Sequence, residues 1–274
     1  MRALESEKKF SEFLLNIGDA KLNDHQNNRE LKHFPPECIA SSNCDIVQEI
    51  YSDIIAEKNF KEFVNRAILS PRNEDVNAIN DKVVDLLDES TEKIYTSIDT
   101  VKNCDNGALS ESLLPEYLNT LNPSSLPPHS LRLRLNSVVI LLRNLSIEEG
   151  LCNGTRLLVL RMSDNVLCCE ILTGDKAGQM AFIHRIALIS ERDFPFKFSR
   201  RQFPIKLAFA MTINKAQGQT FKKIGIDLTR DVFTHGQLYV ALSGVRSWDS
   251  FKIFLNPENV LNSIKNYVFK QILI

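Results

Sequence analysis

Several features that define common protein classes are missing from this 274-residue sequence. No apolar run is long enough to span a membrane, and the opening residues, MRALESEKKF, lack the apolar segment of a signal peptide. The six cysteines show no Cys-x-x-Cys spacing and are not accompanied by a helical His pair, which disfavours a zinc site. We therefore expect no metal site and no membrane partner, and we expect the protein to act inside the cell.

A strong charge of either sign is also missing. The sequence has 33 Lys plus Arg and 34 Asp plus Glu, so its net charge of -1 neither favours nor disfavours a nucleic-acid partner. With 43% apolar residues, the chain can bury a sizeable core. Its length exceeds that of a usual single domain, so we expect one large domain with an insertion, or two packed units.

The first and last parts of the chain alternate apolar strands with amphipathic helices. Helices in SEKKFSEFLLNIGD and DIVQEIYSDII predict a helical connector over residues 1–60. The runs RAILS, EKIYTSID, IKLAFAMT, KIGIDL and FKIFL read as strands, and EDVNAINDKVVDLL, HGQLYVALSGVR and PENVLNSIKNYVFKQIL as helices. This alternation predicts an α/β domain over residues 61–114 and 189–274. Near-continuous apolar runs such as LAFAM favour a parallel sheet with helices on both faces.

The middle of the chain has a different pattern. After a proline-rich boundary, SESLLPEYLNTLNPSSLPP, five short β-like runs follow without a convincing helix between them: LRLRLN, VVILLRN, RLLVLRM, VLCCEIL and MAFIHRIAL. Turn-forming Asn, Asp and Gly residues separate them. We therefore predict a small antiparallel β-barrel over residues 115–188.

A polar loop, TINKAQGQT, follows the predicted strand IKLAFAM. Loops at the carboxyl ends of parallel strands form the binding crevice of open α/β sheets. Gly218 would let the backbone approach a phosphate, and Lys215 offers a positive charge. On composition alone, a well-hydrogen-bonded surface loop without a ligand is the simpler interpretation, and a phosphodiester-binding loop is the alternative.

The preceding stretch, FPFKFSRRQFPIK, interleaves basic and aromatic residues. Arg200 and Arg201 lie among four phenylalanines, an arrangement that suits single-stranded nucleic acid, because cations contact phosphates while rings stack on bases. The alternative interpretation places the phenylalanines in the core and the charges in solvent.

The stretch QFPIKLAFAMTINKAQGQTFKKIGIDLTRDVFTHGQLYVALSGVR closely resembles the last two helicase motifs of the PIF-type 5'-to-3' DNA helicases, especially the branch related to Helitron transposons. AILSPRNEDVNAIN is similar to an earlier motif of that family's second motor domain, and the EYLNTLNPSSLPP…RLLVL region resembles its small β-barrel insert. The resemblance covers nearly the whole chain. It implies a RecA-like motor domain interrupted by the barrel, and it favours the ligand-binding interpretation of the TINKAQGQT loop.

The resemblance also implies roles for particular residues. Single-stranded DNA would be held by Thr212, Asn214, Lys215 and Gln217, with Arg200 and Arg201. The nucleotide cleft would be lined by Gly218, Gln219, Thr220, Gln237, Tyr239 and Ser243. The implied reaction is ATP-driven unwinding of duplex DNA in the nucleus, or alternatively in mitochondria.

Two departures from the family pattern limit this expectation. Gly244 stands where the family's YVALSR ends in the arginine finger, and on a continuing helix Arg246 would point roughly 200° away from that position. No stretch matches the phosphate-binding motif G-x-x-x-x-G-K-[ST], and no apolar strand ends in paired acidic residues for magnesium. We therefore expect no catalytic residue in this sequence.

The family keeps those parts in its first motor domain, which would precede this sequence. The opening MR resembles an internal NMR near the end of that domain, so we expect Met1 to be an internal methionine. ATP and magnesium are implied for the full-length family protein, with the first motor domain as partner, and neither cofactor is expected for this chain alone. The alternatives are a non-catalytic single-stranded DNA-binding module and an inert transposon-derived remnant.

Overall fold

A computed structural model describes residues 7–22, 30–31, 34–102, 114–123, 125–190, 193–256 and 264–269. The chain forms two compact units. Met1–Val83 together with Phe209–Ile274 make up the first, called the α/β unit below, and Val84–Ala208 make up the second, called the β unit. The chain passes from one to the other within a single helix, α3 (Asn73–Asp85).

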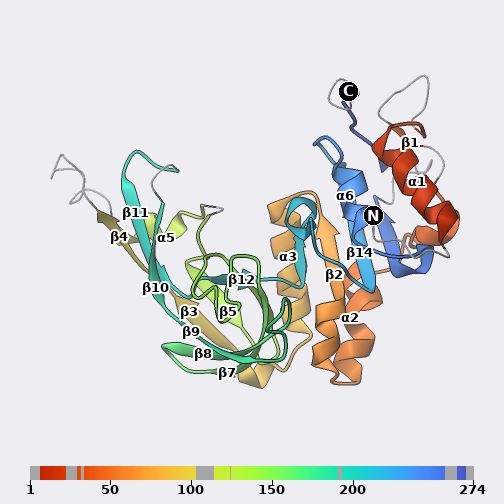
Figure 1. Ribbon diagram of the computed structural model, residues 1–274. Helices are drawn as coiled ribbons and strands as arrows, with labels where there is room; N and C mark the ends of the chain where they lie inside the picture. The colour runs from red at the N-terminus through yellow and green to blue at the C-terminus, as the bar shows by residue number, and fades with distance from the viewer. Residues whose placement is uncertain are drawn as a thin grey trace. The chain divides into compact units, whose positions relative to one another are not determined.

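The α/β unit is built on a four-stranded parallel sheet in the order β13-β2-β14-β15. Its strands β2 and β14 are labelled in Figure 1. These strands are β13 (Ala210–Thr212), β2 (Arg66–Ser70), β14 (Lys223–Leu228) and β15 (Phe251–Leu255). The helices are α1 (Lys8–Gly18), α2 (Ile46–Ala56), α3 and α6 (Gln237–Ser243), and the short 3-10 helices are η1 (Pro36–Cys38), η2 (Phe60–Asn65), η4 (Ile213–Ala216) and η5 (Trp248–Ser250). The predicted α/β class with a parallel sheet is confirmed.

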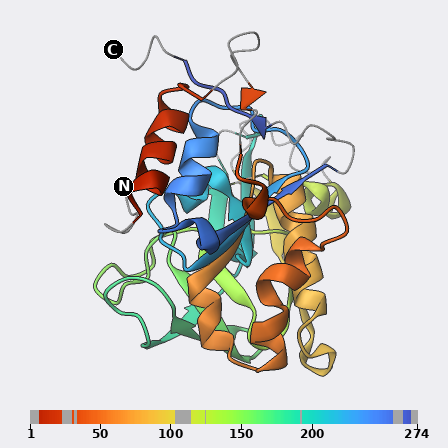
Figure 2. The ribbon, with the colours of Figure 1, turned by 90° about the vertical axis from the view of Figure 1, so that its right-hand side faces the viewer.

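Helices cover both faces of this sheet. On one face, α1 and α6 lie side by side (Figure 2), and their apolar residues share a core with alternate residues of the strands, such as Leu69 and Ile226. On the other face, a Cβ atom at Gly225 would lie 3.0 Å from the side chains of Ile46 and Ile50. The glycine therefore allows α2 to approach β14 closely.

The C-terminal part of the chain differs from the prediction. Within the predicted helix PENVLNSIKNYVFKQIL, the structure describes residues 264–269, which form β16 (Ile264–Lys265) and an irregular segment. β16 pairs antiparallel with β1 (Glu30–Leu31). The helical prediction is wrong for these residues because pairing with a segment far away in the sequence overrides the local periodicity. No helix in the described ranges is long and apolar enough to cross a membrane.

The β unit contains three antiparallel sheets. The largest has the order β12-β6-β7-β8-β9, formed by β12 (Ile205–Leu207), β6 (Val138–Leu141), β7 (Arg156–Met162), β8 (Val166–Ile171) and β9 (Met180–His184). A second pairs β3 (Lys93–Thr96) with β5 (Ser130–Leu133), and a third has the order β10-β11-β4, formed by β10 (Ile186–Ser190), β11 (Lys197–Gln202) and β4 (Ile98–Lys102). Among its described residues, the helices are η3 (Glu89–Thr91) and α5 (Pro115–Thr120). All five β-like runs predicted from the sequence are strands.

Two predicted strands belong elsewhere than expected. EKIYTSID was assigned to the α/β domain, but it forms β3 and β4, which pair with β5 and β11 of the β unit. IKLAFAMT was expected to be one strand, but it forms β12 in the β unit and β13 in the α/β unit. The compact β unit, Val84–Ala208, is therefore wider than the predicted insert at 115–188. Apolar periodicity does not reveal where a continuous apolar run changes its pairing partner.

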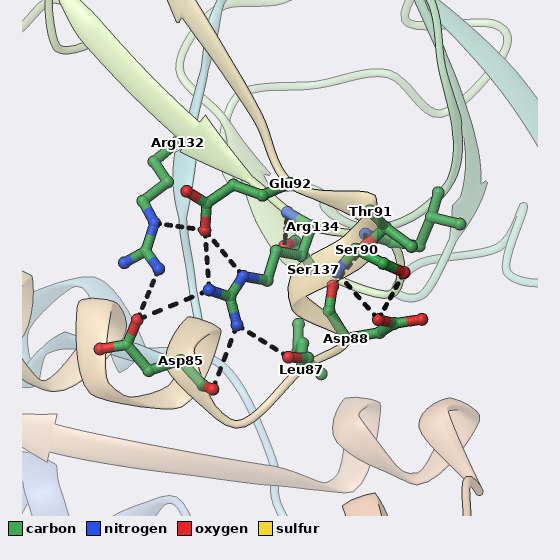
Figure 3. A network of polar contacts seen from close by, with 10 residues as sticks. Asp85, Leu87, Asp88, Ser90, Thr91, Glu92, Arg132, Arg134 and Ser137 are labelled. Atoms are coloured by element: carbon green, nitrogen blue, oxygen red, sulfur yellow. Dashed lines mark hydrogen bonds and ion pairs between the residues drawn. The ribbon is translucent and has the colours of Figure 1, made fainter.

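A polar network within the β unit ties the end of α3 to β5 (Figure 3). Arg134 is buried; its Nε donates to Glu92 Oε2 over 2.8 Å, and its Nη1 donates to the carbonyl of Leu87 over 2.8 Å. Arg132 joins Glu92 to Asp85, with its Nε 2.8 Å from Glu92 Oε2. Hydrogen bonds from Arg134 and Arg132 hold the pKa of Glu92 below its usual range. These arginines therefore have a structural role.

Candidate nucleic-acid interface

The predicted binding loop leaves β13 at the carboxyl edge of the parallel sheet. Thr212, the last residue of β13, lies opposite Ser70, the last residue of β2. Segments that leave neighbouring parallel strands meet at this edge, where ligands bind in open α/β sheets. The loop after Thr212 and the segment after Ser70, which carries Arg72, are therefore neighbours.

Side chains hold the edge strand β13 in place. The buried side chain of Asn80, on α3, donates to the carbonyl of Ala210 over 3.1 Å and accepts from its N–H over 2.8 Å. Tyr51 Oη donates to the carbonyl of Phe209 over 2.6 Å. Since β13 pairs with β2 on one side, the two Asn80 hydrogen bonds take the place of a second ladder. The loop therefore begins at a fixed point.

The loop divides its residues between core and solvent. Its first turn is η4, which buries Ile213 and Ala216 in the core of the α/β unit and exposes Asn214, Lys215 and Gln217. No described residue makes an ion pair with Lys215. The exposed group of polar side chains with one uncompensated cation can contact a phosphodiester backbone.

Gly218 ends this turn with φ +89°, and a Cβ atom there would meet no other atom within 4 Å. Glycine is required at this position by its backbone conformation and not by crowding. The open space leaves room for a ligand beside the backbone.

Two of the predicted nucleotide-cleft residues carry buried polar atoms without partners. Gln219 Oε1, an acceptor, and Gln237 Nε2, a donor, lack hydrogen-bond partners in the described structure. The other amide atoms are used: Gln219 Nε2 donates to the carbonyl of Lys215 over 3.4 Å, and Gln237 Oε1 accepts from the N–H of Phe233 over 3.0 Å. Leaving a buried polar group without a hydrogen bond costs about 1–3 kcal/mol of folding free energy. A hydrogen bond from a polar ligand to either atom would therefore be favourable.

Three other predicted cleft residues lie in different environments. Thr220 is exposed, and Ser243 Oγ donates to the carbonyl of Val240 over 2.9 Å. Tyr239 packs against α1, where a Cβ atom at Gly18 would lie 3.4 Å from its ring. The structure therefore places Tyr239 at the interface of α1 and α6 within the α/β unit.

Gly244 lies beside the Gln219 turn. Its carbonyl accepts a hydrogen bond from Phe221 N over 3.0 Å, and a Cβ atom at Gly244 would lie 3.7 Å from the carbonyl oxygen of Gln219. Gly244 caps α6 with φ -77°, so a side chain can be accommodated there without backbone strain. The helix ends at Ser243, so Arg246 does not lie 200° around a continuing helix, as predicted; it is exposed in the following irregular segment.

The two arginines predicted to contact DNA lie in the β unit and differ sharply. Arg200 is fully buried, with Nε 2.9 Å from Asp99 Oδ1 and Nη2 2.7 Å from Asp99 Oδ2. Its predicted contact with DNA is corrected to a structural ion pair, because alternation along β11 turns its side chain inward. Arg201 is exposed on the opposite face and stays a predicted DNA contact. Of the four phenylalanines, Phe198 and Phe203 are fully buried and follow the core interpretation, whereas Phe194 and Phe196 are partly buried and pack against Phe198 or its cluster.

Sequence reasoning missed Arg72. This residue follows β2 at the same sheet edge as the loop, is exposed, and lies with its guanidinium 5.9 Å from the centre of the Phe233 ring. The pairing of β13 beside β2 is the signal that would have identified it, and that pairing is not readable from the sequence alone. Across the described residues, no three His, Cys, Asp or Glu side chains are grouped to hold a metal ion.

Comparisons with known proteins show what this chain is similar to. Residues 116–162 match the family model for the DNA helicase Pif1, 2B domain. The human ATP-dependent DNA helicase PIF1 is 34% identical over 149 residues, which make up 51% of this chain and 21% of the human protein.

Solved structures extend the similarity to the whole chain. A Pif1 helicase studied for DNA unwinding at forked double-stranded DNA is 25% identical with a TM-score of 0.58, over 100% of this chain and 50% of its own. Pif1 helicase from Candida albicans has the same fold, with a TM-score of 0.62 at 18% identity over 98% of this chain and 57% of its own. The chain thus spans about a fifth of the human relative and about half of each solved structure.

Proposed function

Because this chain is a portion of a PIF-type helicase, we propose that it supplies the C-terminal motor part of an ATP-dependent DNA helicase that moves 5'-to-3' along single-stranded DNA. In this proposal, the α/β unit is the second RecA-like motor domain and residues 1–60 connect it to the first. The site of action is the nucleus, with mitochondria as the alternative.

The β unit would be the family's small β-barrel insert. Its main core supports this role, because Tyr95, Leu131 and Leu133 of the β3–β5 pair share one apolar cluster with the five-stranded sheet. Two sheets around one core are what a small barrel requires.

The observation that carries the DNA-binding part is the carboxyl edge at β13. Exposed Lys215 and Arg72 lie there on neighbouring segments, at a loop whose start is fixed by Asn80. Two cations without acidic partners in the described structure suit phosphates of one strand. The neutral side chains of Thr212, Asn214 and Gln217 add hydrogen bonds that carry no sequence preference.

ATP would bind on the side of the loop where Gln219 and Gln237 leave polar atoms unsatisfied. In the family reaction the nucleotide supplies the free energy for translocation, and these two amides would hydrogen-bond to it. The 274-residue polypeptide by itself would not hydrolyse ATP, since it has no G-x-x-x-x-G-K-[ST] motif and Gly244 replaces the arginine finger.

A second candidate function is a non-catalytic single-stranded DNA-binding module. Gly244 favours it, because loss of the one cation directed at the nucleotide leaves the DNA loop intact. The two candidates differ in whether an added arginine at this position restores ATP turnover.

The DNA-binding proposal is tested by the change Lys215→Ala. Fluorescence anisotropy with a labelled oligonucleotide should show binding that favours single strands and weakens with salt, and the change should reduce the slope of log K against log salt by about 0.7. Lys222→Ala is the matched control, because Lys222 is also exposed but precedes β14 at the opposite edge of the sheet. Equal affinities and slopes for all three proteins would refute the assignment of the loop.

A further inference from the structure

Strands β10, β11 and β4 of the β unit, which are labelled in Figure 1, form a sheet with one covered face and one open face. On the covered face, Leu188 and Phe198 pack with Leu118 of α5 in one apolar cluster. Side chains alternate along each strand, so the residues between these point to the open face.

The open face combines cations with aliphatic side chains. In the pairing register, Arg201 of β11 lies between Ala187 of β10 and Ile98 of β4, and Lys197 lies four residues earlier on β11. Both cations are exposed, and Ile98 and Ile189 are 62% and 40% exposed. None of the described residues on this face is acidic, and none of the described residues elsewhere forms an ion pair with either cation.

This composition suits an acidic polypeptide better than nucleic acid. Single-stranded nucleic acid is bound by cations together with aromatic rings on which the bases stack. The rings of this stretch lie elsewhere, because Phe194, Phe196 and Phe198 belong to the cluster on the covered face. Exposed isoleucines beside unpaired cations are instead complementary to an apolar side chain flanked by carboxylates.

The same chain carries a loop of that composition. Between β6 and β7, Ile147 is 74% exposed, and the exposed residues Glu148 and Glu149 follow it. Neither glutamate makes an ion pair with any residue that the structure describes. The loop therefore presents one aliphatic side chain and two free carboxylates to solvent.

Backbone hydrogen bonds hold this loop in place. Leu145 N donates to the carbonyl of Leu151 over 2.8 Å, and Leu151 N donates to the carbonyl of Ser146 over 2.8 Å. Gly150 N donates to the carbonyl of Ile147 over 3.1 Å, at a φ of +75° that favours glycine. Little conformational freedom is lost when an ordered loop binds a partner.

We propose that this loop of one chain docks on the open face of the β10-β11-β4 sheet in a second copy of the chain. Ile147 would lie between Ile98 and Ile189, and the two glutamates would pair with Lys197 and Arg201. The contact joins two different surfaces, so it links chains head to tail. One loop buries less area than the roughly 1,200–2,000 Å² of a stable interface, so we expect weak association, with a dissociation constant of roughly 100 μM.

Sedimentation equilibrium of the whole chain without DNA tests the proposal. The average molar mass should rise above that of one chain as the protein concentration passes roughly 100 μM. The rise should be smaller in about 1 M sodium chloride, because salt screens exposed ion pairs. The mass of a single chain at every concentration would overturn the proposal.

Charge reversal tests which surfaces meet. The face variant, Lys197→Glu with Arg201→Glu, and the loop variant, Glu148→Lys with Glu149→Lys, should each weaken self-association at least about tenfold. An equimolar mixture of the two variants should associate again, because the face of each then meets an oppositely charged loop of the other. With both variants shown to be folded by circular dichroism, unchanged association of either one, or a mixture that stays monomeric, would refute the contact.

The matched control is Lys9→Glu with Lys82→Glu, which changes the net charge as the face variant does. Both lysines are exposed and belong to the α/β unit, so this control should associate like the unchanged chain. Fluorescence anisotropy with a labelled oligonucleotide tests the other class of partner. If the face variant binds DNA more weakly while the unchanged chain stays monomeric, the face is a nucleic-acid surface and the proposal fails. Because self-association is measured without DNA, that failure is independent of the assignment of the Lys215 loop.

Discussion

The buried arginines of the β unit and the exposed lysine of the predicted DNA loop in the α/β unit differ in burial and pairing. In the β unit, Arg134 is buried and hydrogen-bonded to Glu92 (Figure 3). Arg200 is buried and hydrogen-bonded to Asp99, so both arginines hold strands and helices together. In the α/β unit, Lys215 is exposed at a sheet edge, and no described residue forms an ion pair with it. Burial and pairing identify the structural cations, whereas exposure without an acidic partner among the described residues leaves Lys215 available to a ligand. Neither property can be read from residue type.

The largest expected effect comes from adding a cation where the α/β unit lacks one. In a fusion of this chain to a competent first motor domain of the family, Gly244→Arg should raise DNA-stimulated ATP turnover by about three orders of magnitude or more, as an arginine finger does elsewhere. The backbone allows the side chain, since φ at Gly244 is -77°. A steady-state ATPase assay measures the change.

The control for this prediction is Gly244→Gln, which has a long polar side chain without the charge and should not raise turnover. Equal rates for the unchanged fusion and Gly244→Arg would show that Arg246 or another group already stabilises the transition state. The α/β unit would then contain a functional cation that the sequence motif does not indicate.

A large loss of stability is expected when a structural cation is removed. Arg200→Ala leaves Asp99 buried without its partner, and breaking such a pair costs about 3–5 kcal/mol in the free energy of unfolding. Arg201→Ala, one residue away and exposed, should change it by less than about 0.5 kcal/mol. Urea denaturation followed by circular dichroism measures both.

If Arg200→Ala does not fold, the double change Arg200→Met with Asp99→Leu removes both charges and should recover much of the stability. Similar small losses for Arg200→Ala and Arg201→Ala would contradict the structural role of Arg200. The difference between the two units would then rest on Arg134 alone.

Much of the fold was predictable because it depends on local periodicity. RAILS, KIGIDL and FKIFL alternate with helices, and the parallel sheet they predict is present. The division of IKLAFAMT between two sheets was not predictable, since an apolar run fits either pairing equally well. The same holds for β16, where a helical pattern yields to pairing with β1.

The candidate site was predictable where it is continuous in sequence. The TINKAQGQT loop lies at a carboxyl sheet edge, as expected from the strand before it. Arg72 was not found, because its place at this edge depends on which strands are neighbours. Arg200 was misassigned because a run of basic residues does not reveal which of two adjacent side chains points inward.

The smallest expected effect concerns Arg66, a cation of the α/β unit that is paired. Its guanidinium makes two contacts with Asp53, and this hydrogen bonding holds the pKa of the Asp53 carboxyl below its ordinary value. A lowered pKa means that the pair stabilises the fold above the unfolded-state pKa of about 4 and that this contribution is lost as the pH falls through the folded-state pKa. Asp53 is half exposed, with 52% of its side chain accessible, so the contribution at neutral pH should be only roughly 0.2–1 kcal/mol. Asp53→Asn should therefore be less stable than the unchanged protein at about pH 7 and equally stable near pH 2, when both carry a neutral group. Urea denaturation at the two pH values gives the difference, and Asp231→Asn, an exposed acid, should show no such change. A stability gap for Asp53→Asn that is the same at both pH values would show that the pair contributes through packing and not through charge.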